Sequence, residues 1–112
     1  MTYWTPIWSF RTAKFNVLFS VAPEDIAYDG DDEDGSIQEA INSGELDWFV
    51  ARVQVLHNGC ELGVDYLGAC AYRSSQEFVK IGDYFRDMVR EAVSQARENA
   101  QTISADLAKV HA

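Results

Sequence analysis

The chain has 112 residues, of which 47% are hydrophobic and 12% aromatic, and its formal net charge is −9. This length fits a single domain with one modest core, and the apolar content excludes a chain that is disordered throughout. The sequence holds no apolar run of membrane-spanning length and no signal-peptide pattern at its start. We therefore expect a protein of bacterial or viral origin that lies in the cytoplasm of the host cell.

The negative charge is concentrated in one block. Residues 21–50 contain no Lys or Arg, whereas the remainder of the chain is close to neutral. A block of this kind repels nucleic acid and attracts basic surfaces, so the expected partner is a basic protein surface and direct nucleic-acid binding is disfavoured. The candidate partner-binding residues are its ten acidic side chains: Glu24, Asp25, Asp29, Asp31, Asp32, Glu33, Asp34, Glu39, Glu45 and Asp47.

The first 44 residues predict an N-terminal arm or edge strand, a second segment that is a strand, a loop and a short helix. Residues 1–10 are rich in aromatic side chains and contain Pro6, which favours an N-terminal arm or an edge strand over a central strand, with a partner-binding patch as the alternative. Residues 13–22 alternate apolar and polar side chains and predict a strand. The acidic loop covers 24–35. Ser36 and Glu39 then form a capping-box pattern for a helix that Gly44 would end.

Residues 46–57 and 60–72 predict a hairpin around Asn58-Gly59, the pair typical of a type I′ turn. A two-residue turn sets the register, in which Arg52 faces Asp65 as an ion pair on the polar side. Gly63 and Gly68 are candidate bulge positions that would shift the pairing. The expected apolar-face pairs are His57–Cys60, Val55–Leu62, Val53–Val64, Ala51–Tyr66 and Phe49–Gly68.

The C-terminal part predicts two helices. Ser74 and Glu77 form a second capping box for a helix over 75–81, and Gly82 would end it. Asp83 is the predicted cap of a long helix, whose part beyond 99 extends from the body, frays or packs on a second copy to give a homodimer. Its apolar stripe comprises Phe85, Met88, Val89, Ala92, Val93 and Ala96, and continues more weakly at Ile103, Leu107 and Val110.

These elements predict one α+β domain over 1–112. We expect a three- or four-stranded antiparallel sheet with a short helix and with the long C-terminal helix packed on one face.

Several kinds of chemistry are disfavoured by the spacing of the residues. A calcium loop beginning at Asp29 would have Asp34 where the turn needs Gly and Ala40 where a bidentate Glu is needed. His57 and Cys60 flank the hairpin turn, but Cys70 lies about 33 Å further along a continuous strand at the usual strand rise. No nucleophile or phosphate-loop motif is present. We therefore expect neither a metal, nor a cofactor, nor enzymatic activity.

The acidic loop has two interpretations. It is either a solvated loop whose carboxylates favour the N-terminus of the following helix, or a contact surface. In an extended loop, alternate side chains lie about 7 Å apart, which is the scale of phosphate spacing along a nucleic-acid strand. An ordered array could therefore occupy a Lys/Arg groove built for nucleic acid, as a DNA mimic does.

Three segments carry a resemblance: ELDWFVARVQV (45–55), LGVDYLGACAYRSSQEF (62–78) and DYFRDMVREAVSQAR (83–97). They resemble small acidic proteins of phages and mobile elements of the anti-CRISPR and anti-restriction kind. The resemblance implies a non-catalytic inhibitor of host defence that binds a nucleic-acid-binding complex without a cofactor, and it assigns no individual residues. The alternative is a structural or regulatory protein that self-associates through the aromatic N-terminus and the long helix.

Overall fold

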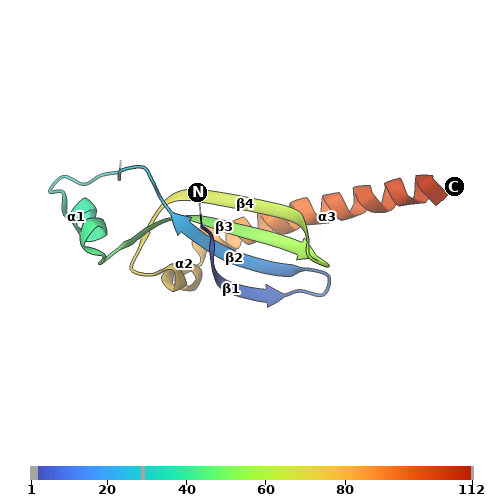
Figure 1. The fold of residues 1–112 in the computed structure, drawn as a ribbon, viewed down its shortest axis with the longest axis horizontal. Coiled ribbons are helices and arrows are strands. Elements are labelled where there is room, and N and C mark those ends of the chain that lie inside the picture. Colours follow the sequence, from blue (N-terminus) through green and yellow to red (C-terminus); the bar gives the residue numbers. More distant parts are fainter. Residues whose placement is uncertain (1–2, 29, 112) are drawn as a thin grey trace.

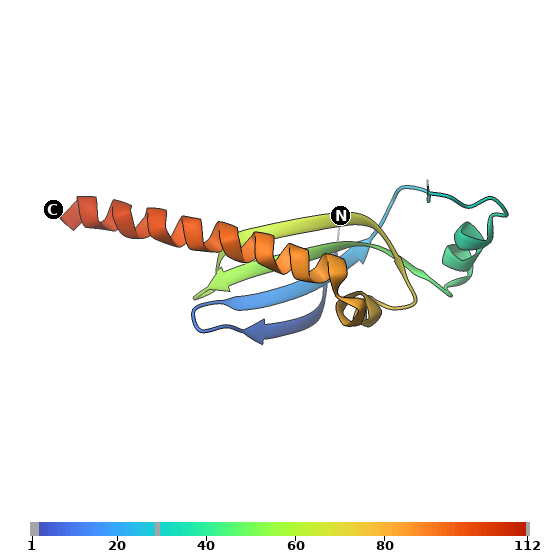
Figure 2. The ribbon, with the colours of Figure 1, turned by 180° about the vertical axis from the view of Figure 1, so that it is seen from behind.

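The computed structural model describes residues 3–28 and 30–111, with side chains as far as Ser104. Four strands form one antiparallel sheet in the order β1-β2-β3-β4 (Figure 1), and α3 lies across one face of it (Figure 2). The predicted α+β fold with a long C-terminal helix is confirmed, and the strands number four. The elements are β1 (Thr5–Arg11), β2 (Asn16–Pro23), α1 (Ser36–Ser43), β3 (Asp47–His57), β4 (Cys60–Tyr72), α2 (Ser75–Ile81) and α3 (Asp83–His111).

The aromatic N-terminal segment forms the edge strand β1. Pro6 is tolerated there because an edge strand has one side without ladder hydrogen bonds. The ring of Trp8 lies 4.9 Å from that of Phe10 and 5.9 Å from that of Phe85 in α3, so part of this aromatic surface is covered by the fold itself. The predicted start of the second strand at residue 13 is wrong, because the backbone N–H of Thr12 donates to Phe15 at 2.8 Å and closes a turn.

The core lies between the sheet and the two C-terminal helices. The alternating residues of β2 and β3 that face α3 are buried, as their period of two predicts. Phe78 of α2 stacks on Phe19 with their ring centroids 5.5 Å apart, which anchors α2 beneath the end of the sheet. The buried cluster includes Val17, Phe19, Phe49, Ala51, Val53, Val55, Phe78, Phe85, Met88, Ala92 and Ala96.

The β3–β4 hairpin has the predicted turn but a different register. Asn58 and Gly59 have φ values of 50° and 80°, as a type I′ turn requires, and His57 pairs with Cys60. A bulge then follows, so Val55 pairs with Gly63 instead of Leu62. The predicted pairs Val53–Val64 and Ala51–Tyr66 are wrong for the same reason, and Phe49–Gly68 is wrong because a second register shift follows between Ala51 and Phe49. The observed partners are Asp65 for Val53, Leu67 for Ala51 and Cys70 for Phe49.

The shifted register also removes the predicted ion pair between Arg52 and Asp65. Arg52 faces Tyr66 across the strands, whereas Asp65 faces Val53 on the opposite side of the sheet. The guanidinium of Arg52 lies 4.2 Å from the ring centroid of Trp4, which replaces the ion pair by a cation–π contact.

The close approach of α3 explains this bulge. A Cβ at Gly63 would overlap the backbone carbonyl oxygen of Ala92, so only glycine fits where the helix crosses β4. Side chains of α3 also satisfy backbone groups around the bulge: Asn99 donates to the carbonyl of Leu62, and the N–H of Val64 donates to Gln95. The bulge is therefore stabilised by contacts that arise only in the folded protein.

The C-terminal helices begin near their predicted positions. The hydroxyl of Ser74 accepts a hydrogen bond from the N–H of Glu77 at 3.2 Å, so Ser74 caps α2 as predicted, and Gly82 ends that helix in the left-handed conformation. Asp83 is the first residue of α3 and not its cap, because the carbonyl of Gly82 already accepts from the N–H of Arg86 at 2.8 Å.

α3 continues past the sheet as a projecting helix (Figures 1 and 2). Ile103 on this projection is 49% exposed, and the side chains of Leu107 and Val110 lie outside the described residues, as does Ala112. Of the three predicted arrangements for 99–112, an extended helix is the one observed as far as His111. Within the described part of the chain, no helix is both long and apolar enough to cross a membrane.

Candidate acidic interaction site

Residues 24–47 form an acidic lobe at the end of the sheet opposite to the projecting end of α3 (Figure 1). The lobe consists of the loop after β2, the helix α1 and the approach to β3. It contains the ten predicted site residues, of which Asp29 lies outside the described part of the chain. The molecule measures 65 × 24 × 23 Å, so the lobe and the projecting helix occupy the two ends of its long axis.

Two of the acidic residues cap α1. The carboxylate of Asp32 accepts from the backbone N–H of Ile37 at 2.9 Å and from that of Gln38 at 3.0 Å, one bond to each oxygen. Asp34 accepts from the N–H of Ser36 at 3.0 Å. Carboxylates at this position satisfy N–H groups that have no intrahelical partner and favour the positive end of the helix dipole.

The predicted Ser36–Glu39 capping box is therefore wrong. The N-cap position is Gly35, with φ of 72° and no side-chain cap, and the helix starts at Ser36. The Asp side chains reach back from the preceding loop, so a Ser cap is not needed. The predicted end of the helix is correct, because Gly44 adopts the left-handed conformation with φ of 85°.

The hydrogen bonds to Asp34 also affect its acidity. Donation from Ser36, by its side chain and by its backbone N–H, holds the pKa of Asp34 below its ordinary value of 3.8. This carboxyl group is therefore an anion at neutral pH and is engaged within the lobe.

Glu24 connects the base of the lobe to the sheet. Its Oε2 accepts from the backbone N–H of Ala69 at 2.8 Å, and its own backbone N–H donates to the carbonyl of Trp48 at 3.2 Å. Ala69 has a φ of 55° at a second bulge of β4, where the ladder with β3 is interrupted. Glu24 therefore supplies an acceptor that β3 does not offer.

Trp48 holds the loop against α1 and the start of β3. Its indole N–H donates to the carbonyl of Ile26 at 2.7 Å, and its ring lies 5.6 Å from that of Tyr28 in an edge-to-face arrangement. The N–H of Tyr28 in turn donates to the side chain of Gln38 on α1 at 3.1 Å. The described parts of the loop are thus held at Glu24, at Ile26 and Tyr28, and at Asp32, although the sequence carries no pattern that would reveal the aromatic contacts.

The structure divides the predicted site residues into two groups. Glu24, Asp32 and Asp34 accept hydrogen bonds within the chain. The remaining site residues that the structure describes are exposed. Within the described residues, their carboxylates accept no hydrogen bond and contact no Lys or Arg side chain, because Asp87–Arg90 is the one ion pair in that part of the chain. We call this second group the free carboxylates: Asp25, Asp31, Glu33, Glu39, Glu45 and Asp47.

The remaining polar candidates are engaged elsewhere. The Lys14 carbonyl can only accept, so Nδ1 of His57 carries the hydrogen and donates to it at 3.0 Å, which links the two hairpin turns. Cys60 is exposed and Cys70 is buried, and burial raises the pKa of the Cys70 thiol to about 11. Among the described residues, no three His, Cys, Asp or Glu side chains are grouped so that they could hold a metal ion.

No protein-family model, no curated protein and no solved structure matches this chain. The resemblance of the three sequence segments to phage-borne inhibitors therefore stays a prediction.

Proposed function

We propose that this protein is a small non-catalytic inhibitor that docks its acidic lobe on a basic, nucleic-acid-binding surface of a host-defence complex in the cytoplasm. The observation that carries the proposal is the set of free carboxylates on one folded lobe, without a cation among the lobe residues. The class of target comes from the resemblance to anti-CRISPR and anti-restriction proteins.

The order of the lobe supports tight docking. A charged loop that is already folded loses little conformational entropy when it binds, so more of its electrostatic attraction appears as affinity. Asp32 caps α1 and Trp48 holds the loop, which leaves Asp31 and Glu33 directed away from these internal bonds as exposed side chains. These internal bonds support a lobe whose backbone is already folded before it docks.

The internal bonds also redefine the mimicry hypothesis. Of the two sets of alternate residues in the loop, Asp32 and Asp34 bind backbone N–H groups of α1, so only the set with Asp31 and Glu33 is left for a phosphate-like array. A phosphate-like surface on this lobe would therefore combine Asp31 and Glu33 from the loop with Glu39 from α1 and Glu45 after it. A Lys/Arg groove that binds a phosphate backbone complements such a surface in charge.

A phage-plating assay tests the proposal. Host strains that each carry one active CRISPR or restriction system would express the chain and be challenged with a targeted phage. We expect the wild-type chain to raise plating by orders of magnitude in at least one strain. The variant D31N/E33Q/E39Q/E45Q should lose this protection, because it neutralises four free carboxylates and leaves the caps intact.

A matched control separates the lobe from net charge. The variant E61Q/D87N/E91Q/E98Q removes the same number of exposed acidic residues from the rest of the molecule and should keep full protection. An equal loss of protection in both variants would contradict docking through the lobe. So would a wild-type chain that protects the phage in none of the strains.

A further inference from the structure

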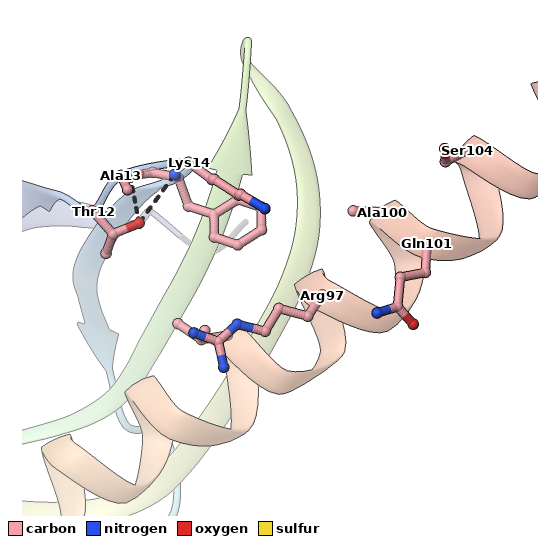
Figure 3. A pocket seen from close by; sticks show the side chains of 9 residues that line it. Thr12, Ala13, Lys14, Arg97, Ala100, Gln101 and Ser104 are labelled. Atoms are coloured by element: carbon pink, nitrogen blue, oxygen red, sulfur yellow. Dashed lines mark hydrogen bonds between the residues drawn. The ribbon is translucent and has the colours of Figure 1, made fainter.

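The turn that joins β1 to β2 and the facing side of α3 enclose a groove with a volume of about 520 Å³. The buried Phe15 lines it together with Val93 and Ala100, which are partly buried. Figure 3 shows Arg97 reaching from α3 toward the turn, which carries Lys14. The groove therefore combines an apolar lining with a cation from each of its two walls.

A second groove, with a volume of about 450 Å³, adjoins the first. It shares Lys14, Phe15 and Ala100 with the first groove and adds Arg11. Arg11, Lys14 and Arg97 are all exposed, and within the described residues none of them forms an ion pair. No acidic residue is among the described residues that line either groove. We call the two together the basic groove, a surface whose described lining supplies no counter-charge.

The turn that carries Lys14 is held in place by hydrogen bonds. The backbone N–H of Thr12 donates to the carbonyl of Phe15 at 2.8 Å, and the N–H of Phe15 donates to the hydroxyl of Thr12 at 3.1 Å. Nδ1 of His57 donates to the carbonyl of Lys14 at 3.0 Å and ties the turn to the end of β3. Because this backbone is already folded, an anion that docks there orders few groups, and more of the attraction appears as affinity.

The other end of the same molecule complements the basic groove in charge. The lobe carries the free carboxylates, and residues 21–50 contain no Lys or Arg. It also exposes 55% of Ile26, an apolar side chain that suits the apolar lining of the groove. The eight residues of β2 separate the two surfaces by about 25 Å at the usual strand rise, so a lobe cannot fill the groove of its own chain (Figures 1 and 2).

We propose that the basic groove receives the acidic lobe of a second copy of the chain, so that copies associate head to tail. Asp31 and Glu33 of the lobe supply carboxylates to Lys14 and Arg97, which gain the counter-charge that the groove lacks. Two different surfaces of the molecule form this contact, so each added copy leaves one lobe and one groove free. Such a contact does not close on itself, and further copies can add.

The net charge of −9 does not prevent this contact. At physiological ionic strength the Debye length is about 8 Å, so charges further than this from the contact are largely screened. Inside that distance a lobe meets the cations of the groove. A symmetrical contact of lobe on lobe would instead bring like charges together, which is unfavourable. The charges thus select the head-to-tail arrangement over a dimer joined through its lobes.

This contact gives the lobe a competitor for its proposed target. A lobe that occupies the groove of another copy has its carboxylates covered, so self-association and target binding use the same residues. The fraction of free lobes then falls as the chain concentration rises, and a target with a more strongly basic surface releases them. Self-association itself needs no target, so it stands or falls separately from the proposed function.

Mixing two complementary variants tests the contact by sedimentation equilibrium of the full chain. K14Q/R97Q loses the groove cations and keeps the lobe, whereas D31N/E33Q/E39Q/E45Q loses the lobe carboxylates and keeps the groove. At about 100 μM chain in low salt, each variant alone should have the 12.6 kDa mass of one chain. Their equimolar mixture should approach twice that mass and stop, because it has one usable lobe and one usable groove per pair. The wild-type mass should keep rising with concentration.

Two matched controls separate this contact from net charge. K80Q/R86Q removes two exposed cations outside the groove, and E61Q/D87N/E91Q/E98Q removes four exposed acids outside the lobe. Both should associate no less than the wild-type chain. Raising the salt from about 0.05 M to about 0.5 M should return the wild-type chain to the mass of one copy. A wild-type chain that is monomeric in low salt or stops at two copies would overturn the proposal, as would a mixture that stays monomeric.

A labelled single-stranded oligonucleotide tests the other anionic occupant that the basic groove could take. We expect its fluorescence anisotropy to stay constant when the wild-type chain is added at the same concentration and salt, because the acidic remainder of the molecule repels a long polyanion. Binding that K14Q/R97Q abolishes would assign the groove to nucleic acid and overturn self-docking. Circular dichroism of each variant reports whether its helices remain.

Discussion

The carboxylate of Glu24 accepts a hydrogen bond from the backbone N–H of Ala69, 45 residues further along the chain, at 2.8 Å. Ala69 has a left-handed φ of 55° at a bulge of β4, so its N–H is directed away from the ladder with β3. The first acidic residue of the lobe therefore fastens the lobe to the sheet, and the bulge and the lobe stabilise each other.

Replacing Glu24 tests this attachment. Glu24→Ala should lower the free energy of unfolding by about 1–3 kcal/mol, because the N–H of Ala69 loses a charged acceptor. Glu24→Gln keeps an acceptor oxygen and should lose less. Urea unfolding measures both. Asp25→Ala is the control: this exposed neighbour has no side-chain partner in the described residues, so a change above about 0.5 kcal/mol would contradict the account.

The caps of α1 can be distinguished from the capping box that the sequence predicts. Asp32→Ala should remove about 1 kcal/mol of stability from α1, whereas Ser36→Ala should have a smaller effect, because the Ser36 hydroxyl donates to Asp34 and accepts from none of the backbone N–H groups that Asp32 satisfies. Hydrogen exchange of the Ile37 and Gln38 amides reports this directly. Faster exchange in S36A than in D32A would restore the capping box.

The lobe should lose stability at low pH. The pKa of Asp34 in the folded chain lies below its ordinary value of 3.8, owing to the hydrogen bonds from Ser36. A carboxyl group whose pKa is lower in the folded chain than in the unfolded chain stabilises the fold at any pH above its pKa in the unfolded chain. This contribution disappears as the pH falls through the pKa of the folded chain. Following the Ser36 amide by NMR from pH 6 to pH 2 should show a transition below about 4 that is absent in Asp34→Asn. A transition above that pH would contradict the lowered pKa.

Gly63 should tolerate no side chain. Gly63→Ala places a methyl group against the backbone carbonyl of Ala92, so α3 must move away from β4, and we expect a loss of about 3 kcal/mol or more in thermal or urea unfolding. Val64→Ala, a neighbouring truncation in β4, serves as a comparison and should cost about 1 kcal/mol. Wild-type stability of G63A would show that the helix does not cross β4 at this position.

The two thiols should react at different rates. Cys60 is exposed, whereas Cys70 is buried with a pKa of about 11 and donates its S–H to the carbonyl of Leu67 at 3.3 Å. A colorimetric thiol reagent at pH 8 should modify one thiol quickly and the second only as the chain unfolds, because the thiolate is the reactive form. Two equally fast thiols would contradict the burial of Cys70.

The raised pKa of Cys70 also means that its contribution to stability is complete below its unfolded pKa and is lost as the pH rises through about 11.

Local signals in the sequence were sufficient for most of the fold. The Asn58-Gly59 turn, the Ser74 cap and the glycines after α1 and α2 depend on the chain within a few residues of each, and all four are confirmed. The two register shifts of β4 lie at the predicted bulge positions, next to Gly63 and at Gly68, but the pairing that results was not predictable in the same way. Its bulge depends on Gly63 meeting Ala92 and on Asn99 and Gln95 satisfying the freed backbone groups, and these contacts join distant segments.

The acidic site shows the same division. Charge counting located the lobe, because composition alone reveals a block without Lys or Arg. It did not separate carboxylates that bind the chain from those that are free, since Asp32 and Asp31 are adjacent acidic residues with opposite roles. That separation depends on where the loop turns, which Trp48 and Tyr28 determine through contacts across 20 or so residues.

The most direct test of the acidic-lobe proposal is a competition titration with the purified defence effector that the plating assay identifies. Labelled DNA bound to the effector would be followed by fluorescence anisotropy while the chain is added. We predict that the wild-type chain and E61Q/D87N/E91Q/E98Q displace the DNA at equal concentrations, that D31N/E33Q/E39Q/E45Q needs at least about tenfold more, and that added salt weakens displacement. Equal displacement by the two charge-matched variants, or none by the wild-type chain, would contradict recognition through the free carboxylates.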